Sequence, residues 1–200
     1  MEDLCKKALD LGATRAAPIS PKDVIIDLRV RLKCQVPRCR SYGENLTCPP
    51  NCLSVEEFKE FLECYEQGVF IQLDYQIPKK TKSKIEDTDS LAKLYLDKQY
   101  LNNQNKNTQK GKESLNDIIT NVESEAFSSG YYFATGFVGG GCSKCETCVG
   151  PGNPCRFPFY ARPSLEAVGI DVFKTAERVG FKLEFPVRDR IVWSGMVLVK

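Results

Sequence analysis

Eight of the ten cysteines fall into two groups of four, and this grouping constrains how the chain can fold. The first cysteine set consists of Cys34, Cys39, Cys48 and Cys52. The second cysteine set consists of Cys142, Cys145, Cys148 and Cys155. Four thiolates can share a metal ion or an iron-sulfur cluster only if the backbone brings them together. We therefore expect two tight loops, each holding one metal centre.

The second set has the spacing of an iron-sulfur ligand run. Its first three members are each separated by two residues, so that each thiolate can reach a different corner of a cubane. Cys155 supplies the fourth corner. Pro154 precedes the last cysteine, whereas the ferredoxin run has its proline after it, so the match is to the ligand geometry alone. This spacing predicts a [4Fe-4S] cluster.

The first set has gaps that belong to no widely shared motif, so its support comes from its surroundings. Pro37, Pro49, Pro50 and Gly43 lie among its four cysteines and favour a stiff loop. Scattered buried cysteines are the alternative, because cysteine often packs as a small apolar residue. Four thiols in so short, polar and proline-rich a stretch favour a second cluster instead.

Disulfides and zinc are the competing explanations for the cysteines. The sequence starts Met-Glu-Asp, and Lys6 and Lys7 have no apolar run behind them, so we expect no signal peptide and a reducing, cytoplasmic location. Zinc stays open as the alternative cofactor. However, zinc ribbons usually show two separated Cys-x2-Cys pairs, and the first set contains none. We predict that Cys5 and Cys64, outside both sets, are packing residues.

The composition excludes several classes of function. The net charge is only +2, so nothing global indicates nucleic acid, and no stretch is apolar enough to span a membrane. The chain contains no histidine, which removes Ser-His and Cys-His catalysis, histidine-ligated metals and Rieske-type clusters. We therefore expect no catalytic side chain of these classes.

Helical and strand patterns alternate along the chain. We expect helices over 2–11, from the Ser54/Glu57 capping box to Gly68, over 113–126 and over 171–179. We expect strands over 13–19, 27–34, 69–75, 131–138 and 191–199, with the strand over 27–34 delivering Cys34. Residues 79–112 are rich in lysine and asparagine and predict a polar, mobile insertion, with a possible short helix at Leu91, Leu94 and Tyr95.

These elements predict one domain over residues 1–200, of the α/β or α+β class. It would have a mixed sheet, flanking helices and two cysteine-rich loops at strand ends. Gly139, Gly140 and Gly141 enter the second loop, where inward-turned amides could face an anion. Because no dinucleotide or phosphate-loop motif follows a strand, we assign these glycines to the cluster rather than to a nucleotide.

Further motifs in both halves carry a family resemblance. They are Cys39-Arg-Ser-Tyr-Gly43, Leu46-Thr-Cys-Pro-Pro50, Ala161-Arg-Pro-Ser164, Gly169-Ile-Asp-Val172 and Trp193-Ser-Gly-Met-Val-Leu198. With the cysteines, they resemble an uncharacterised cysteine-rich family of predicted metal-binding proteins, found mostly in methanogens and other anaerobes. The resemblance covers nearly the whole chain except 79–112. It implies a metal, of iron-sulfur type, in an anaerobe's cytoplasm, and it brings no activity.

If both sets are complete, every iron has a protein ligand and no position is open for a substrate. This favours a non-catalytic electron-transfer protein with two [4Fe-4S] clusters, serving a redox protein or a larger metalloenzyme complex and its activation machinery. One alternative is a redox or sulfur-chemistry enzyme with an open or unusual cluster. The other is a zinc-stabilised interaction module.

Basic residues stand beside several of the cysteines. They are Arg29, Arg31, Lys33, Arg156 and Arg162. They could offset the charge of a cluster or recruit an acidic ferredoxin, or they could be ordinary solvated residues.

Overall fold

The protein folds around one antiparallel sheet of four strands, in the order β1-β2-β4-β3. The computed structural model describes residues 1–76, 98–183 and 190–200, and the side chains of 98–108 are not described. The strands are β1 (Arg15–Ile19), β2 (Gln67–Gln76), β3 (Thr135–Phe137) and β4 (Arg190–Val199). The two long strands at the centre, β2 and β4, pair along their whole length, from Gln67 opposite Val199 to Gln76 opposite Arg190.

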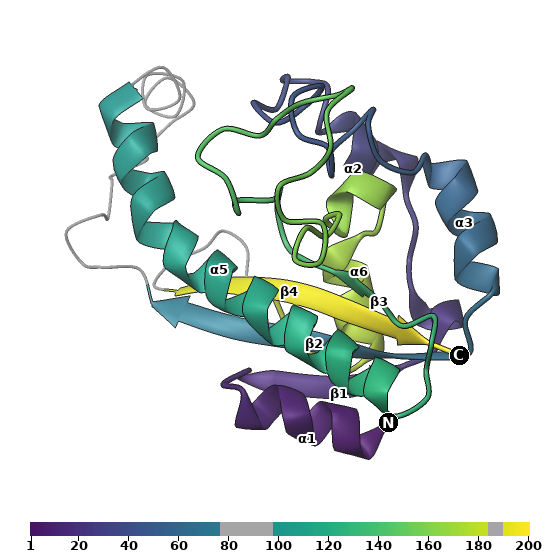
Figure 1. The fold of residues 1–200 in the computed structure, drawn as a ribbon. Coiled ribbons are helices and arrows are strands. Elements are labelled where there is room, and N and C mark those ends of the chain that lie inside the picture. The colour runs from purple at the N-terminus through teal and green to yellow at the C-terminus, as the bar shows by residue number, and fades with distance from the viewer. Residues whose placement is uncertain (77–97, 184–189) are drawn as a thin grey trace.

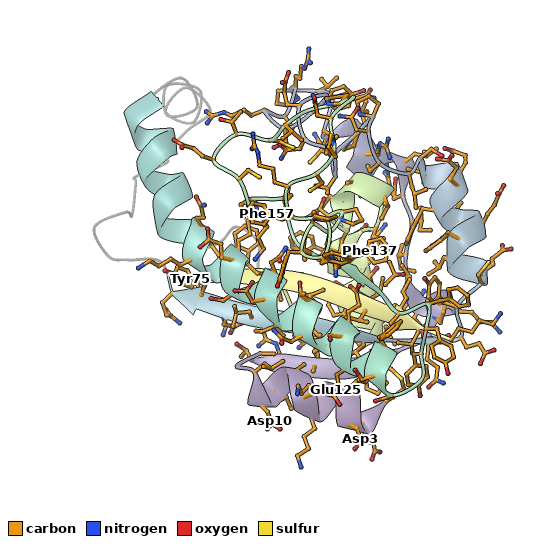
Figure 2. The ribbon with its side chains drawn as sticks, viewed as in Figure 1. Asp3, Asp10, Tyr75, Glu125, Phe137 and Phe157 are labelled. Carbon is orange, nitrogen blue, oxygen red and sulfur yellow. The ribbon has the colours of Figure 1, made fainter. Side chains whose placement is uncertain are left out.

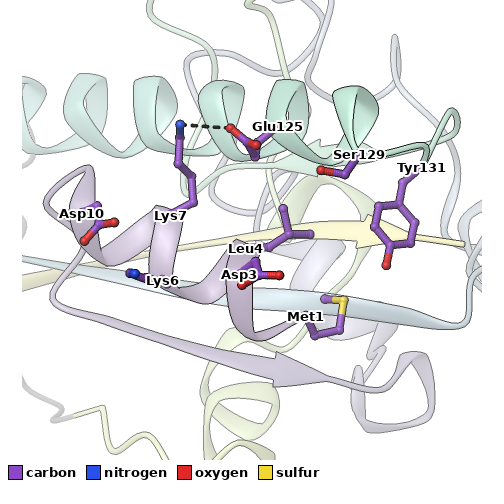
Figure 3. A pocket seen from close by; sticks show the side chains of 9 residues that line it. All are labelled: Met1, Asp3, Leu4, Lys6, Lys7, Asp10, Glu125, Ser129 and Tyr131. Atoms are coloured by element: carbon purple, nitrogen blue, oxygen red, sulfur yellow. Dashed lines mark ion pairs between the residues drawn. The ribbon is translucent and has the colours of Figure 1, made fainter.

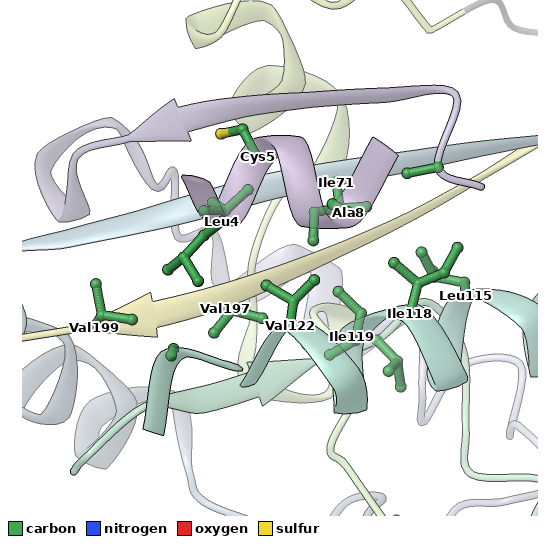
Figure 4. Close-up of a cluster of buried hydrophobic side chains, with 14 residues drawn as sticks. Leu4, Cys5, Ala8, Ile71, Leu115, Ile118, Ile119, Val122, Val197 and Val199 are labelled. Atoms are coloured by element: carbon green, nitrogen blue, oxygen red, sulfur yellow. The ribbon is translucent and has the colours of Figure 1, made fainter. Parts of the chain in front are cut away.

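One face of the sheet is covered by two helices, α1 (Glu2–Asp10) and α5 (Lys98–Ser128) (Figure 1). Apolar residues spaced three or four apart on α5 meet alternate residues of β2 and β4, as expected for an amphipathic helix on a sheet. Figure 4 shows this core cluster, whose members include Leu4, Ala8, Ile71, Leu115, Ile119, Val122 and Val197. Nearly all of these side chains are fully buried.

The other face of the sheet carries shorter elements. These are η1 (Pro21–Asp23), α3 (Val55–Glu63), η3 (Glu166–Val168) and α6 (Val172–Arg178). Phe58 of α3 packs edge to face against Phe137, labelled in Figure 2, with ring centroids 5.3 Å apart. Phe70 and Met196 point to the same face from β2 and β4 and are fully buried. The sheet is thus covered on both faces.

Two helix starts follow the sequence prediction. Ser54 caps α3, because its hydroxyl accepts a hydrogen bond from the Glu57 N–H at 3.1 Å while the Glu57 carboxylate accepts one from the Ser54 N–H at 2.7 Å. Asp171 caps α6 by accepting a hydrogen bond from the Lys174 N–H at 3.1 Å. Both caps are confirmed.

The predicted strand over 27–34 is wrong, because Leu28–Leu32 form a short helix, α2. The Asp27 carboxylate accepts a hydrogen bond from the Arg29 N–H at 2.9 Å, which caps the helix. Leu28 and Leu32 are 57% and 51% exposed, so the alternation does not mark a buried strand face. The first loop is therefore entered from a helix.

The remaining predicted elements agree with the structure in type and differ at their boundaries. The helix from the Ser54 cap ends at Glu63, before Gly68, which lies in β2. The helix predicted over 113–126 starts earlier, at Lys98. Residues 98–112 of the predicted insertion therefore belong to α5. Residues 79–97 of the predicted insertion, with the short helix proposed at Leu91, lie outside the described residues. Strand β3 is shorter than predicted.

The described residues decide between the two fold classes predicted from the sequence. Every strand pairing described is antiparallel, and the chain is a mixed α+β single domain. None of the described helices combines the length and the apolar character needed to cross a bilayer.

Candidate metal centres in two adjoining cysteine loops

Both cysteine sets lie in irregular loops outside the sheet. The first loop connects α2 to α3, and the second runs from β3 to η3 (Figure 1). Figure 1 places these loops on the opposite side of the sheet from α1. All ten cysteines are free thiols.

The first set gathers around one buried thiol. Cys48 is buried, Cys34 and Cys52 are half-buried, and Cys39 is exposed. Burial and, behind it, charge repulsion from the other three thiols of the set raise the pKa of Cys48 to about 11. A thiol in such surroundings becomes a stable thiolate only beside a compensating positive charge, such as a metal ion.

All four thiols of the second set line one cavity. The cavity is small and partly open to solvent. The other lining residues are Asn45, Leu46, Thr47, Lys144, Phe157 and Ala161. Three of these, at positions 45–47, come from the first cysteine loop, so the two loops build this cavity together.

Backbone N–H groups point at three of the four sulfurs in the second loop. Burial alone would raise the pKa of Cys148, but hydrogen bonds from the N–H groups of Gly150, Leu46 and Val149 lower it overall. The Phe157 N–H donates to the Cys155 sulfur at 3.4 Å. Cys142 receives a hydrogen bond from its own loop, from the Lys144 N–H, although burial keeps its pKa raised. Such donors stabilise negative charge on sulfur.

The donor set fits a thiolate-liganded group. The Thr47 hydroxyl, on the cavity wall, is buried and has no hydrogen-bond partner among the described residues. A polar atom left in this way is typical of a site that is completed by a bound group. The described residues offer no ready-made arrangement of three or more Cys, Asp or Glu side chains around one ion position. The thiols would therefore have to draw together on binding.

The two loops touch at Gly141. A Cβ atom there would lie 3.1 Å from the Cys48 sulfur and 3.2 Å from the Ser41 hydroxyl, so glycine permits this close approach. The Asn45 side-chain amide also donates a hydrogen bond to the Cys142 carbonyl at 3.2 Å. Gly141, directly before the second set, thus lets the two loops come into contact.

The basic residues noted in the sequence have different surroundings. The Arg31 guanidinium donates to the carbonyls of Leu53 and Ala167, at 2.6 and 2.7 Å. Burial raises the pKa of Cys34 and Cys52, and the positive charge of Arg31 offsets part of that rise. It therefore belongs to the first site.

The two arginines beside the second set differ in the groups that they contact. Arg156 donates to the Thr147 carbonyl at 3.0 Å, and its charge helps to lower the pKa of Cys148. Arg162 instead pairs with Glu123 at 2.7 Å, at the edge of the core. Only Arg156 of this pair acts on a cysteine of the site.

The cysteines outside the two sets differ from each other. Cys5 is buried in the core cluster under α1, as predicted. Cys64 is exposed at the C-terminal end of α3, so its prediction as a packing residue is wrong. The helical pattern placed Cys64 on α3 but could not tell that the helix ends there.

A second, polar groove lies between α1 and α5 (Figure 3). Its walls include an ion pair between Lys7 and Glu125, 3.0 Å apart, and it contains no cysteine. The groove has no cluster of convergent ligands, and we assign no chemistry to it.

The fold and the two loops define an α+β domain with thiol-rich candidate metal sites. The chain belongs to the family of predicted metal-binding proteins DUF2284, whose model matches residues 17–199. The family resemblance is confirmed, while the link to methanogens and other anaerobes stays a prediction. No curated protein and no solved structure matches the chain.

Proposed function

We propose that this protein carries two [4Fe-4S] clusters, one on each cysteine set, and transfers electrons to a partner metalloenzyme or its activation complex. The observation that carries the proposal is the second loop, where four thiols line one cavity and backbone N–H groups reach three of their sulfurs. Amide donors to sulfur are among the features that set the potential of an iron-sulfur cluster.

The residues of the chain would hold and tune the clusters. The eight thiolates would be the ligands, and the amides around Cys148 would offset their negative charge. Arg31 and Arg156 would add positive charge at the first and second site. A bound cluster supplies one-electron oxidation and reduction. With four protein ligands on each cluster, no iron is left open for a substrate, which favours electron transfer over catalysis.

The contact between the two loops supports a relay within one chain. Gly141 adjoins both Cys142 and the Cys48 sulfur, so the two sites share a wall. An electron received at one site would then need to travel only a short distance to the other. The ten free thiols fit a reducing compartment, and we propose a cytoplasmic location.

The surface around Cys34 and Cys39 supports an acidic redox protein as the partner. Residues 28–43 contain no Asp or Glu. Four basic side chains in this stretch are exposed, and they are Arg29, Lys33, Arg38 and Arg40. Arg29 is paired with Asp27, but Lys33 and Arg40 have no ion pair to any described residue. Basic surfaces of this kind steer acidic partners and make association sensitive to salt.

Cysteine variants purified without oxygen test the proposal. We expect Cys48→Ala and Cys145→Ala each to lose the electron paramagnetic resonance signal of one dithionite-reduced cluster and to keep the other. Cys64→Ala is the matched control, because Cys64 is free, exposed and outside both sets. It should retain both signals. A colourless wild-type protein with bound zinc would contradict the proposal and favour a zinc-stabilised module.

A further inference from the structure

A lysine on α5 reaches the contact between the two cysteine loops. Lys112 is half-buried, and its side chain lies against Gly140. A Cβ atom at Gly140 would lie 3.6 Å from the Lys112 Cε and 4.0 Å from its Nζ. The next residue, Gly141, is the one that touches the Cys48 sulfur. The ammonium group is therefore placed at the boundary between the two sites.

The Lys112 charge acts on one thiol of each set. It opposes the rise in the pKa that burial causes at Cys142, and it does so more weakly at Cys48. Burial lowers the pKa of Lys112 itself, and the neighbouring thiols Cys142 and Cys48 raise it in return. Interactions in such half-buried surroundings are screened less than those on the surface.

Glu166 is the acidic residue at the same glycine. Its carboxylate accepts a hydrogen bond from the Gly140 N–H at 3.3 Å, and its charge acts on both Lys112 and Cys34. Lys112 and Glu166 thus both lie next to Gly140. Among the described residues, the Lys112 ammonium group has no direct ion pair.

We propose that Lys112 serves both metal sites electrostatically, raising the reduction potential of each with one ammonium group. The inference rests on the proposed function. Each site would take one electron from a reduced redox protein, or from dithionite in the test below, and that donor would be oxidised in turn; no bond would be made or broken and no proton moved. The added negative charge is stabilised by Lys112 at whichever site it arrives. Removing the charge would make both sites harder to reduce.

Potentiometric titration of the iron-loaded protein, followed by electron paramagnetic resonance, tests this role. We expect Lys112→Met to lower the ratio of reduced to oxidised cluster at a fixed potential about tenfold at each site, a shift of about 59 mV for a one-electron couple. Lys112→Arg should recover most of the wild-type ratio. Lys110→Met is the matched control, because Lys110 lies on the same helix and is exposed. It should titrate like the wild type.

Several outcomes would overturn the inference. If Lys112→Met keeps its iron and both sites titrate like the wild type, or if only one site shifts, Lys112 does not act on both sites. If Lys112→Met loses iron, Lys112→Gln and Lys112→Arg decide. Loss in both would assign the side chain a packing role, whereas retention in Lys112→Arg alone would show that the charge is needed. A wild-type protein without iron would instead refute the proposed function, before any variant is compared.

Discussion

At the scale of single residues, the eight candidate ligands are chemically unequal. Cys148 accepts three backbone hydrogen bonds that lower its pKa, whereas burial and like charges raise the pKa of Cys48 to about 11. The thiolate form of Cys148 is therefore populated at lower pH than that of Cys48. We infer that Cys148 is the first thiol of the chain to accept a metal.

Alkylation of the metal-free protein at different pH values checks this order. Thiolates react and thiols do not, so Cys148 should be modified by iodoacetamide faster than Cys48 at every pH below about 11. Both rates should rise with pH. The Cys48 rate should reach half of its maximum at a markedly higher pH than the Cys148 rate. Peptide mass spectrometry gives the site-specific rates. Equal rates at pH 8 in folded protein would contradict the description of the two loops.

At this scale the sequence singled out the eight cysteines and the basic residues next to them in the chain, but not the groups that reach them from other segments. Their spacing is a local signal. The Leu46 N–H that donates to Cys148, and Lys112 beside Gly140, come from other segments of the chain. No periodicity or motif indicates such contacts, since they depend on how the loops and α5 pack together.

At the scale of secondary structure, side-chain caps decided which predictions succeeded. The sequence predicted the Ser54 and Asp171 caps, and α3 and α6 begin there. At α2 the alternation of leucine and arginine suggested a strand, but Asp27 caps a helix instead. Alternation indicates a strand only when one set of side chains becomes buried, and Leu28 and Leu32 do not.

The α3 cap gives a prediction for stability. Ser54→Ala removes the acceptor for the Glu57 N–H, so we expect the free energy of unfolding to fall by about 1 kcal/mol. Urea denaturation followed by circular dichroism measures the change. Ser129→Ala, at an exposed position just after α5, is the control and should change stability much less. An equal loss in both variants would show that the capping box contributes nothing.

At the scale of the whole molecule, the apolar core and the cysteine loops are separate parts of the fold. None of the eight candidate ligands belongs to either core cluster of the sheet. The antiparallel sheet and its covering helices have their own buried cores, while the loops hold all eight candidate ligands. The sequence placed both cysteine sets in loops at strand ends, but the strand that it predicted to deliver Cys34 is the helix α2.

Metal removal should therefore loosen the loops and spare the sheet. In hydrogen exchange after chelation, we expect faster exchange at 33–53 and 139–163. The amides of β2 and β4, which pair over their full length, should stay protected. Mass spectrometry of peptides from metal-loaded and metal-free protein measures both. Collapse of protection in β2 and β4 would mean that the metal sites hold the whole fold together.

Whether both cysteine sets hold iron-sulfur clusters is decided by counting iron, acid-labile sulfide and zinc per chain. The protein should be purified without oxygen and analysed as isolated. Our account predicts about eight irons and about eight sulfides, four of each per cubane. Stoichiometric zinc without sulfide would contradict it.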